Sequence, residues 1–504
     1  MNLLKQNISA TLLGNAWMAL MGLVFVPLYI KFLGIESYGL IGFFAMLQVM
    51  TGLLDMGFSG TLNREMARLS VLPEKEQEIR NLVRSLEIIY WCIALVIGIV
   101  VITASPFIAH HWVRAEQLSS STIEQAVLIM GFTLMLQWPI SFYAGGLTGL
   151  QRQIILNAVN ISISTLRGVG AVAVLWLISP TIQAFFLWQI IISATHTFLL
   201  VTFFWRKLPK SENRPVFQKQ LLKGIGRFAA GIGGTTILGI ILTQVDKIIL
   251  SKMLSLEMFG YYALASIIAL SPLRVSVSLF ASIYPRFTQL VSLNAQEGLK
   301  QLYHKGCQFM AVLILPASIV VALYSYEIIL LWTQNPITAE KSHLLVSILI
   351  CGTALNALMY LPHALQLSFG WTRLFFFSNL VAVVLFVTSI VYMTANYGAT
   401  GAASVWLILN VGYVLFEVPL MHRRLLNKEK WRWYWQDVLI PLAVALVIAS
   451  SGKLFISSSM AQFTLLIYLS IISVLTLGIT AIITPVTRDW LWGQLLKIKL
   501  ADRN

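Results

Sequence analysis

Long apolar runs, with no alternation of polar and apolar positions, recur along the whole chain. Each run holds about 20 residues, enough for an α-helix to cross about 30 Å of hydrocarbon at about 1.5 Å per residue. The strands of a membrane barrel would instead show about 10 residues of alternating polarity. The pattern therefore predicts an all-α integral membrane protein with about 14 transmembrane helices.

A polar break separates the first six predicted spans from the other eight. The break, residues 206–225, is charged, contains proline and is too short for a domain, so we expect a cytoplasmic linker between two lobes. The spans are expected near residues 10–33, 37–58, 84–104, 124–146, 157–179, 181–204, 226–252, 258–282, 306–330, 342–367, 376–394, 401–421, 438–455 and 462–483.

An internal repeat supports two lobes of six helices. Leu33-Gly-Ile-Glu-Ser-Tyr-Gly39 resembles Leu254-Ser-Leu-Glu-Met-Phe-Gly260, and Gly149-Leu-Gln-Arg152 resembles Gly370-Trp-Thr-Arg373, both pairs at an offset of 221 residues. We therefore expect two duplicated lobes related by a pseudo-two-fold axis along the membrane normal. The expected parts are an N-terminal lobe at 1–205, the linker at 206–225, a C-terminal lobe at 226–423, and two further helices with an amphipathic cytoplasmic tail at 424–504.

The composition agrees with an integral membrane protein and gives no indication of a soluble domain. Hydrophobic residues make up 58% of the chain and charged residues 11%, against about 25% charged in soluble proteins. Cys92, Cys307 and Cys351 lie in or beside apolar runs without the spacing of a disulfide framework or a metal site. No metal and no other cofactor is expected.

The net charge of +15 is explained by orientation in the membrane rather than by nucleic acid. If the predicted spans alternate, about 27 of the 35 Lys and Arg fall on one face, and only Lys31, Arg114, Lys252, Lys341 and Lys453 fall on the other. Cationic loops stay in the cytoplasm, so both termini are expected there.

Two stretches resemble a known family. Leu54-Asp-Met-Gly-Phe-Ser-Gly-Thr-Leu-Asn-Arg-Glu-Met-Ala-Arg68 is similar to the Asp-x-Gly...Arg-Glu-x-Ala motif of bacterial polysaccharide flippases of the Wzx type. Gln244-Val-Asp-Lys-Ile-Ile-Leu250, followed by Phe259-Gly-Tyr-Tyr-Ala-Leu-Ala265, is similar to a second stretch of that family. The family belongs to the multidrug/oligosaccharidyl-lipid/polysaccharide exporter superfamily.

The resemblance implies a function and a location. A Wzx-type protein moves an undecaprenyl-diphosphate-linked oligosaccharide, such as an O-antigen repeat unit of lipopolysaccharide, from the cytoplasmic to the periplasmic leaflet by alternating access. It would lie in the bacterial inner membrane among membrane lipids, with a polysaccharide polymerase and a chain-length regulator as partners. Energy would come from the membrane potential, a proton or sodium gradient, or removal of the substrate on the far side.

A flippase needs cationic groups inside the bilayer to shield a diphosphate from hydrocarbon. Arg167 lies near the middle of the predicted span 157–179, and Arg274 lies beside Pro272 in the span 258–282. A guanidinium group can bind a diphosphate through two parallel hydrogen bonds. We expect Arg167, Arg274 and Arg64 to contact the substrate, with structural ion pairs or snorkelling to the interface as the alternatives.

Acidic residues in or beside the spans are candidates for gating or ion coupling. Asp55 is expected to form a gate-closing ion pair with Arg64, or to lie on a solvated loop. Asp246 and Lys247 are adjacent, and because neighbouring helical side chains point about 100° apart, each is expected to need a partner elsewhere. Glu417, beside Pro419, is a candidate for proton coupling.

Prolines inside the spans break helical hydrogen bonds and allow bending. Pro27 and Pro272 are the candidates for bending sites that let the lobes switch. The single histidines His196 and His363 are interpreted as packing residues with satisfied polar atoms.

Two other functions remain open from the sequence. A drug or small-solute antiporter of the same superfamily would keep the fold and change the cargo. A membrane glycan polymerase or glycosyltransferase would need a large extramembrane catalytic loop, but the longest predicted outer loop runs only from about Ser105 to Ile123 and has no paired carboxylates. The chain also has no Gly-x-x-x-x-Gly-Lys-Ser/Thr sequence, so we expect no ATP hydrolysis and no enzyme.

Overall fold

A computed structural model describes residues 2–55, 57–72, 75–220, 244–456 and 460–489, and these residues form helices joined by short connections. Eleven helical segments in the described ranges are long and apolar enough to cross a membrane, and Ser9–Val24 is a shorter apolar helix. The predicted all-α fold with many transmembrane helices is confirmed. Most of the span predicted at 226–252 lies outside the described residues.

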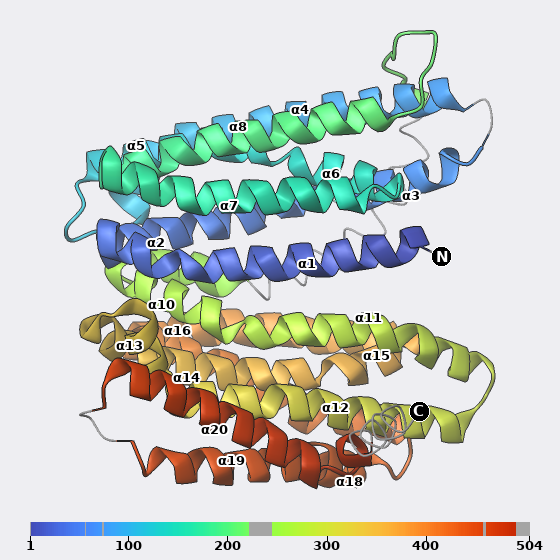
Figure 1. Ribbon diagram of the computed structural model, residues 1–504, viewed down its shortest axis with the longest axis vertical. Helices are drawn as coiled ribbons and strands as arrows, with labels where there is room; N and C mark the ends of the chain where they lie inside the picture. The colour runs from blue at the N-terminus through green and yellow to red at the C-terminus, as the bar shows by residue number, and fades with distance from the viewer. Residues whose placement is uncertain (1, 56, 73–74, 221–243, 457–459, 490–504) are drawn as a thin grey trace, which may run out of the picture. The chain divides into compact units, whose positions relative to one another are not determined.

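The chain divides into two compact units, Met1–Gly260 and Tyr261–Asn504, and Figure 1 labels their helices. In the first unit α4 packs against α5, α5 against α8, and α7 against both α1 and α8. The lobe boundaries expected from the sequence stay a prediction. The helices of the first unit are α1 (Asn2–Val24), α2 (Val26–Gly52), η1 (Leu53–Asp55), α3 (Phe58–Leu69), α4 (Glu76–Phe107), η2 (Ile108–Trp112), α5 (Ser120–Gln137), α6 (Ile140–Gly149), α7 (Gln153–Leu177) and α8 (Ile182–Lys207).

The second unit is built around α12, which packs against α11, α14, α19 and α20. Its core includes the fully buried side chains of Tyr303, Tyr324 and Trp433. Helix α10 (Leu256–Ala269) begins in the first unit and continues in the second. The other helices are α11 (Ser271–Ser292), α12 (Gln296–Leu323), α13 (Ser325–Thr333), α14 (Pro336–Leu358), α15 (Tyr360–Ser368), α16 (Thr372–Gly412), η3 (Tyr413–Glu417), α17 (Val418–Arg424), α18 (Lys430–Arg432), η4 (Trp433–Leu439), α19 (Ile440–Lys453) and α20 (Gln462–Ile483).

Prolines and glycines mark the helix breaks. Pro27 lies in the first turn of α2 and Pro272 in the first turn of α11, where a missing backbone N–H is tolerated. Gly34 has φ 80° and separates the first two predicted spans within α2. Gly398 has φ 59° and divides α16 between the predicted spans 376–394 and 401–421. Only glycine adopts such angles at little cost, so these two residues set the turns.

The segment after α8 is hydrogen-bonded to the first part of α4. Residues 208–218 have no regular secondary structure. The backbone N–H of Val216 donates to Asn81 Oδ1 at 2.9 Å, and the N–H of Gln218 donates to Ser85 Oγ at 2.8 Å. The backbone groups of this extended segment are therefore partly satisfied by polar side chains of one helix.

The repeat is visible in the backbone, with one correction to its register. The Arg152 N–H donates to the Leu147 carbonyl at 2.9 Å, and the Trp371 N–H donates to the Gln366 carbonyl at 3.0 Å. The left-handed residue of each turn is Gln151 (φ 56°) in one copy and Gly370 (φ 66°) in the other. This connection repeats at an offset of 219, so pairing 149–152 with 370–373 was wrong by two residues. The left-handed position sets the register, and different residue types occupy it in the two copies.

Candidate functional site

A cavity of about 520 Å³, lined in part by polar side chains, lies within the first unit, among helices long enough to cross the membrane. Polar groups at membrane depth are costly unless they are bonded or face water or ligand, so a cavity lined by them is the first candidate for a functional site. The cavity is lined by Gln48, Thr51, Gly52, Asp55, Ser59, Leu134, Gln137, Trp138, Ile140, Ser141, Arg167 and His196.

The Asp-x-Gly motif forms one wall of the cavity by ending a transmembrane helix. Gly57 has φ 80° and starts α3 in a new direction. Asp55 Oδ2 accepts a hydrogen bond from Ser59 Oγ at 2.8 Å, and Asp55 Oδ1 accepts one from Tyr90 Oη at 2.5 Å. These bonds account for the motif locally: the carboxylate caps the turn, and the glycine makes the turn possible.

Arg167 is the cation of this cavity. It lies in the middle part of α7 and is half-buried. Its backbone carbonyl accepts a hydrogen bond from Trp188 Nε1 at 3.3 Å, whereas its guanidinium has no hydrogen-bond or ion-pair partner among the described residues. The five N–H donors of Arg167 are therefore available to a bound ligand or to water.

Two glutamine side chains that line the cavity are hydrogen-bonded to each other. Gln48 Nε2 donates to Gln137 Oε1, and Gln137 Nε2 donates to Ser193 Oγ at 2.9 Å. His196 Nε2 lies 3.1 Å from Asn160 Oδ1. Sequence reasoning missed both glutamines; the available signal was that each is an uncharged polar residue inside a predicted span, at 37–58 and 124–146.

The other predicted cations lie elsewhere. Arg64 is exposed on α3 and Arg274 is exposed on α11, and neither lines the cavity that holds Arg167. Lys247 Nζ lies 3.1 Å from Asp246 Oδ2, so these neighbours do pair with each other, and the partners expected elsewhere stay a prediction. The four-carbon side chain of lysine folds back along the helix surface and overcomes the 100° difference in direction.

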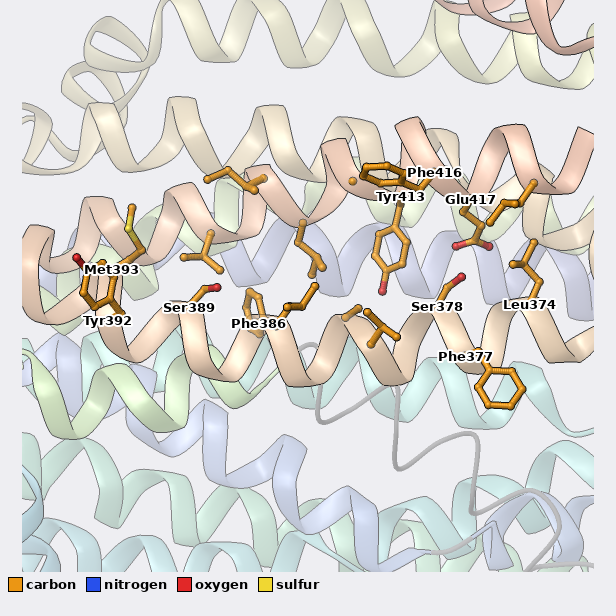
Figure 2. Close-up of a pocket in the computed structure, with 18 residues that line it drawn as sticks. Leu374, Phe377, Ser378, Phe386, Ser389, Tyr392, Met393, Tyr413, Phe416 and Glu417 are labelled. Atoms are coloured by element: carbon orange, nitrogen blue, oxygen red, sulfur yellow. The ribbon is translucent and has the colours of Figure 1, made fainter.

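A second cavity lies in the second unit, along α16. Figure 2 shows this groove of about 740 Å³ between the two arms of α16, with Tyr413, Ser378 and Glu417 pointing into it near one end. Its other lining residues are mostly apolar. Glu417, in the π-helical turn η3, is only 2% exposed.

Glu417 has polar partners on α15. The Gln366 side chain donates to Glu417 Oε1 at 2.9 Å, and His363 Nε2 lies 3.0 Å from the same oxygen. The carboxylate predicted for ion coupling is thus bonded inside the unit.

Comparison with known proteins gives a consistent picture. The sequence model of the family described as "Polysaccharide biosynthesis protein" matches residues 4–291. A Shigella flexneri protein named "Putative O-antigen transporter" is 20% identical over 377 residues, which is 75% of this chain and 87% of that protein. The resemblance found in the Asp-x-Gly stretch is thereby confirmed.

Two solved structures share the fold. The lipid II flippase MurJ in an inward closed conformation superposes with a TM-score of 0.69 at 14% identity, covering 96% of this chain and 99% of that one. An inward-facing multidrug resistance MATE family transporter of the MOP superfamily superposes with a TM-score of 0.64 at 13% identity, covering 81% and 94%. Because the family match covers more than half of the chain, this protein belongs to the polysaccharide biosynthesis protein family, and its fold is the one shared by MurJ and the MATE transporters.

Proposed function

We propose that this protein is a flippase that moves an undecaprenyl-diphosphate-linked oligosaccharide from the cytoplasmic to the periplasmic leaflet of the bacterial inner membrane by alternating access. Membership of the polysaccharide biosynthesis family supports a glycan cargo, and the names of the Shigella protein and of MurJ describe transporters rather than enzymes. The observation that carries the proposal is Arg167, a guanidinium without a partner among the described residues, in a cavity among helices long enough to cross the membrane.

The position of Arg167 has an energetic cost that a ligand would offset. An arginine at the centre of a membrane helix costs roughly 2.5–3.5 kcal/mol on insertion scales. Two parallel N–H donors match the oxygens of a phosphate group, and the low dielectric strengthens such a contact. In this proposal Arg167 holds the diphosphate while the lipid tail stays in the bilayer.

The proposal includes an orientation and an energy source. Both termini lie in the cytoplasm, following the distribution of Lys and Arg. The membrane potential or an ion gradient drives the cycle, with Glu417 as the acidic candidate for coupling.

The test is leaflet-resolved labelling of the lipid-linked sugar in cells that carry Arg167→Ala, Arg167→Lys or Arg152→Ala as the only copy. Arg152 precedes the same helix α7 and is exposed, so it controls for the loss of a positive charge. Arg167→Ala is expected to reduce outer-leaflet labelling on the order of tenfold or more, since it removes charged hydrogen bonds worth roughly 1.5–3 kcal/mol each. Arg167→Lys should retain part of the activity, and Arg152→Ala nearly all of it.

Normal labelling in the Arg167→Ala strain, with normal membrane levels of the protein, would contradict the proposal. The second candidate, a drug antiporter, is favoured by the MATE fold. Drug sensitivity of a deletion strain whose surface glycans are intact would establish that function instead.

A further inference from the structure

We infer that the Arg167 cavity is a sugar subsite, in which Gln48, Gln137 and Trp138 contact the oligosaccharide next to the diphosphate and set which sugar is accepted. This inference rests on the proposed function and names the part of the cargo that the cavity takes.

Beyond Arg167, the cavity lining favours an uncharged polar group. The lining holds one cation, Arg167, and one carboxylate, Asp55. Asp55 accepts hydrogen bonds from Ser59 and Tyr90, and among the described residues it forms no ion pair with Arg167. The other polar lining residues are mostly uncharged, so beside the diphosphate that Arg167 holds, the cavity suits an uncharged polar group. Among the described residues, no group of three His, Cys, Asp or Glu could hold a metal ion.

The hydrogen-bonding groups match hydroxyl groups. Each sugar hydroxyl both donates and accepts, and an amide offers two donors and an acceptor oxygen side by side. Gln48 and Gln137 are half-buried and line the cavity. In the described residues the Gln48 side chain makes a single hydrogen bond, to Gln137, which leaves one of its N–H groups and its oxygen for a ligand.

Trp138 adds an apolar surface beside the amides. Its Nε1–H donates to the Thr51 carbonyl at 3.0 Å, so the polar atom of the indole is already bonded. Trp138 is 7% exposed and Tyr90 packs against its ring, with 4.6 Å between the ring centroids, so the uncovered ring carbons are the part that can contact a ligand. A sugar ring has hydroxyls at its edge and C–H groups on its face, and an aromatic ring beside polar groups suits both. This combination distinguishes a sugar from water or from a free phosphate.

The size of the cavity limits how much of the cargo it takes. A volume of about 520 Å³ lies within the roughly 300–1,000 Å³ usual for small-molecule sites. The cavity is therefore suited to the sugar nearest the diphosphate, with Arg167 at the junction of the two.

The test measures binding to the purified full-length protein in nanodiscs. The probes are farnesyl diphosphate and three derivatives that carry one glucose, galactose or N-acetylglucosamine on the terminal phosphate. The wild type is expected to bind at least one derivative on the order of tenfold more tightly than the sugar-free probe, as a few net hydrogen bonds would give. Gln48→Met and Gln137→Met should reduce that ratio to about one or two without changing the affinity for the sugar-free probe.

Gln183→Met is the matched control, since Gln183 lies on α8 outside the cavity and bonds to Gln125 at 3.3 Å. It should keep the wild-type ratio. Gln48→Met removes a single bond, so it serves as the informative variant if Gln137→Met does not fold. Equal wild-type affinity for all four probes, or an unchanged ratio in both cavity variants, overturns the sugar subsite but leaves the flippase proposal standing. Binding of none of the probes overturns both.

Discussion

Gly39 and Gly260 each leave room for the backbone of the segment that contains the other. A Cβ added to Gly39 would lie 2.4 Å from the Leu256 carbonyl oxygen, and one added to Gly260 would lie 2.5 Å from the Ile35 carbonyl oxygen. Residues 39 and 35 correspond to 260 and 256 at the offset of 221 found in the sequence. The contact is therefore reciprocal, as expected where two copies of one motif meet, and it lies within the first compact unit.

Gly39→Ala and Gly260→Ala should each destabilise the protein by about 1–3 kcal/mol, the usual cost of overpacking, because the obstructing atoms belong to backbone that does not move easily. Thermal unfolding of the purified protein measures this. Gly22→Ala is the control, since nothing lies within 4 Å of a Cβ added there. An unfolding temperature for Gly39→Ala equal to that of the control would show that the two segments are not in close contact in the folded protein.

Gly57→Ala should reduce stability by about 1–2 kcal/mol because its φ of 80° is strained for any residue with a Cβ. Gly60, one turn later in α3, has open space around it. Gly60→Ala should be neutral or stabilising by up to about 1 kcal/mol, since alanine favours the helix. The two substituted positions lie one helical turn apart. Comparing the unfolding temperatures of the two variants therefore separates backbone strain from the general effect of alanine. Similar shifts of the unfolding temperature in both variants would show that residue 57 does not adopt a left-handed conformation.

His304 and Asp437 form a buried pair that should contribute strongly to the stability of the second unit. Their side chains are 1% and 0% exposed, and His304 Nδ1 lies 2.5 Å from Asp437 Oδ2. Gln308 also donates to Asp437, at 2.9 Å. His304→Ala should cost roughly 3–5 kcal/mol because it leaves a buried carboxylate without its main partner. Chemical denaturation or thermal melting of the purified variant would measure the loss.

The double variant His304→Leu with Asp437→Leu should be more stable than His304→Ala, since the buried carboxylate is removed with its partner. Glu429, which also pairs with His304, is 18% exposed and keeps Lys300 and Arg432 nearby. Glu297→Ala is a control in which an exposed ion pair to Lys300 is lost. That change should cost under about 1 kcal/mol. A small effect of His304→Ala, comparable with Glu297→Ala, would mean that the buried pair does not form.

Asn81→Ala should loosen the segment that follows α8. The substitution removes the acceptor for the Val216 N–H and for Gln77 Nε2, a loss of about 1 kcal/mol or more. Trypsin should then cleave after Lys210 roughly fivefold faster, because cleavage follows the population of the open segment. Thr202→Ala is the control, since Thr202 Oγ1 bonds to its own helix at Phe198. Equal cleavage rates in the two variants would show that Asn81 does not hold the segment.

The membrane spans could be predicted from the sequence because the length of an apolar run is a local property. Arg167 could be singled out for the same reason, as a lone charge in an otherwise apolar run. The helix breaks at Pro27 and Pro272 also follow from local chemistry. These predictions need no knowledge of which helices are neighbours.

Partnerships between helices could not be predicted in the same way. Gln48 and Gln137 are 89 residues apart, and only the packing of α2 against α5 brings their amides together. The pairing of Glu417 with His363 likewise depends on the approach of two segments that are distant in sequence. The register of the second repeat depended on a backbone angle rather than on matching residue letters. Sequence reasoning thus finds which residues are unusual, and the fold determines what they meet.

Because of the π-helical turn at Tyr413–Glu417, the contacts of Glu417 depend on the exact number of residues in this turn. Such a turn contains one residue more than the α-helical turn it replaces. Loss of a single codon there would restore a regular helix and rotate every later side chain of this segment by about 100° relative to α15. An in-frame deletion of one residue could therefore separate the carboxylate from His363 and Gln366 without altering any of the three side chains.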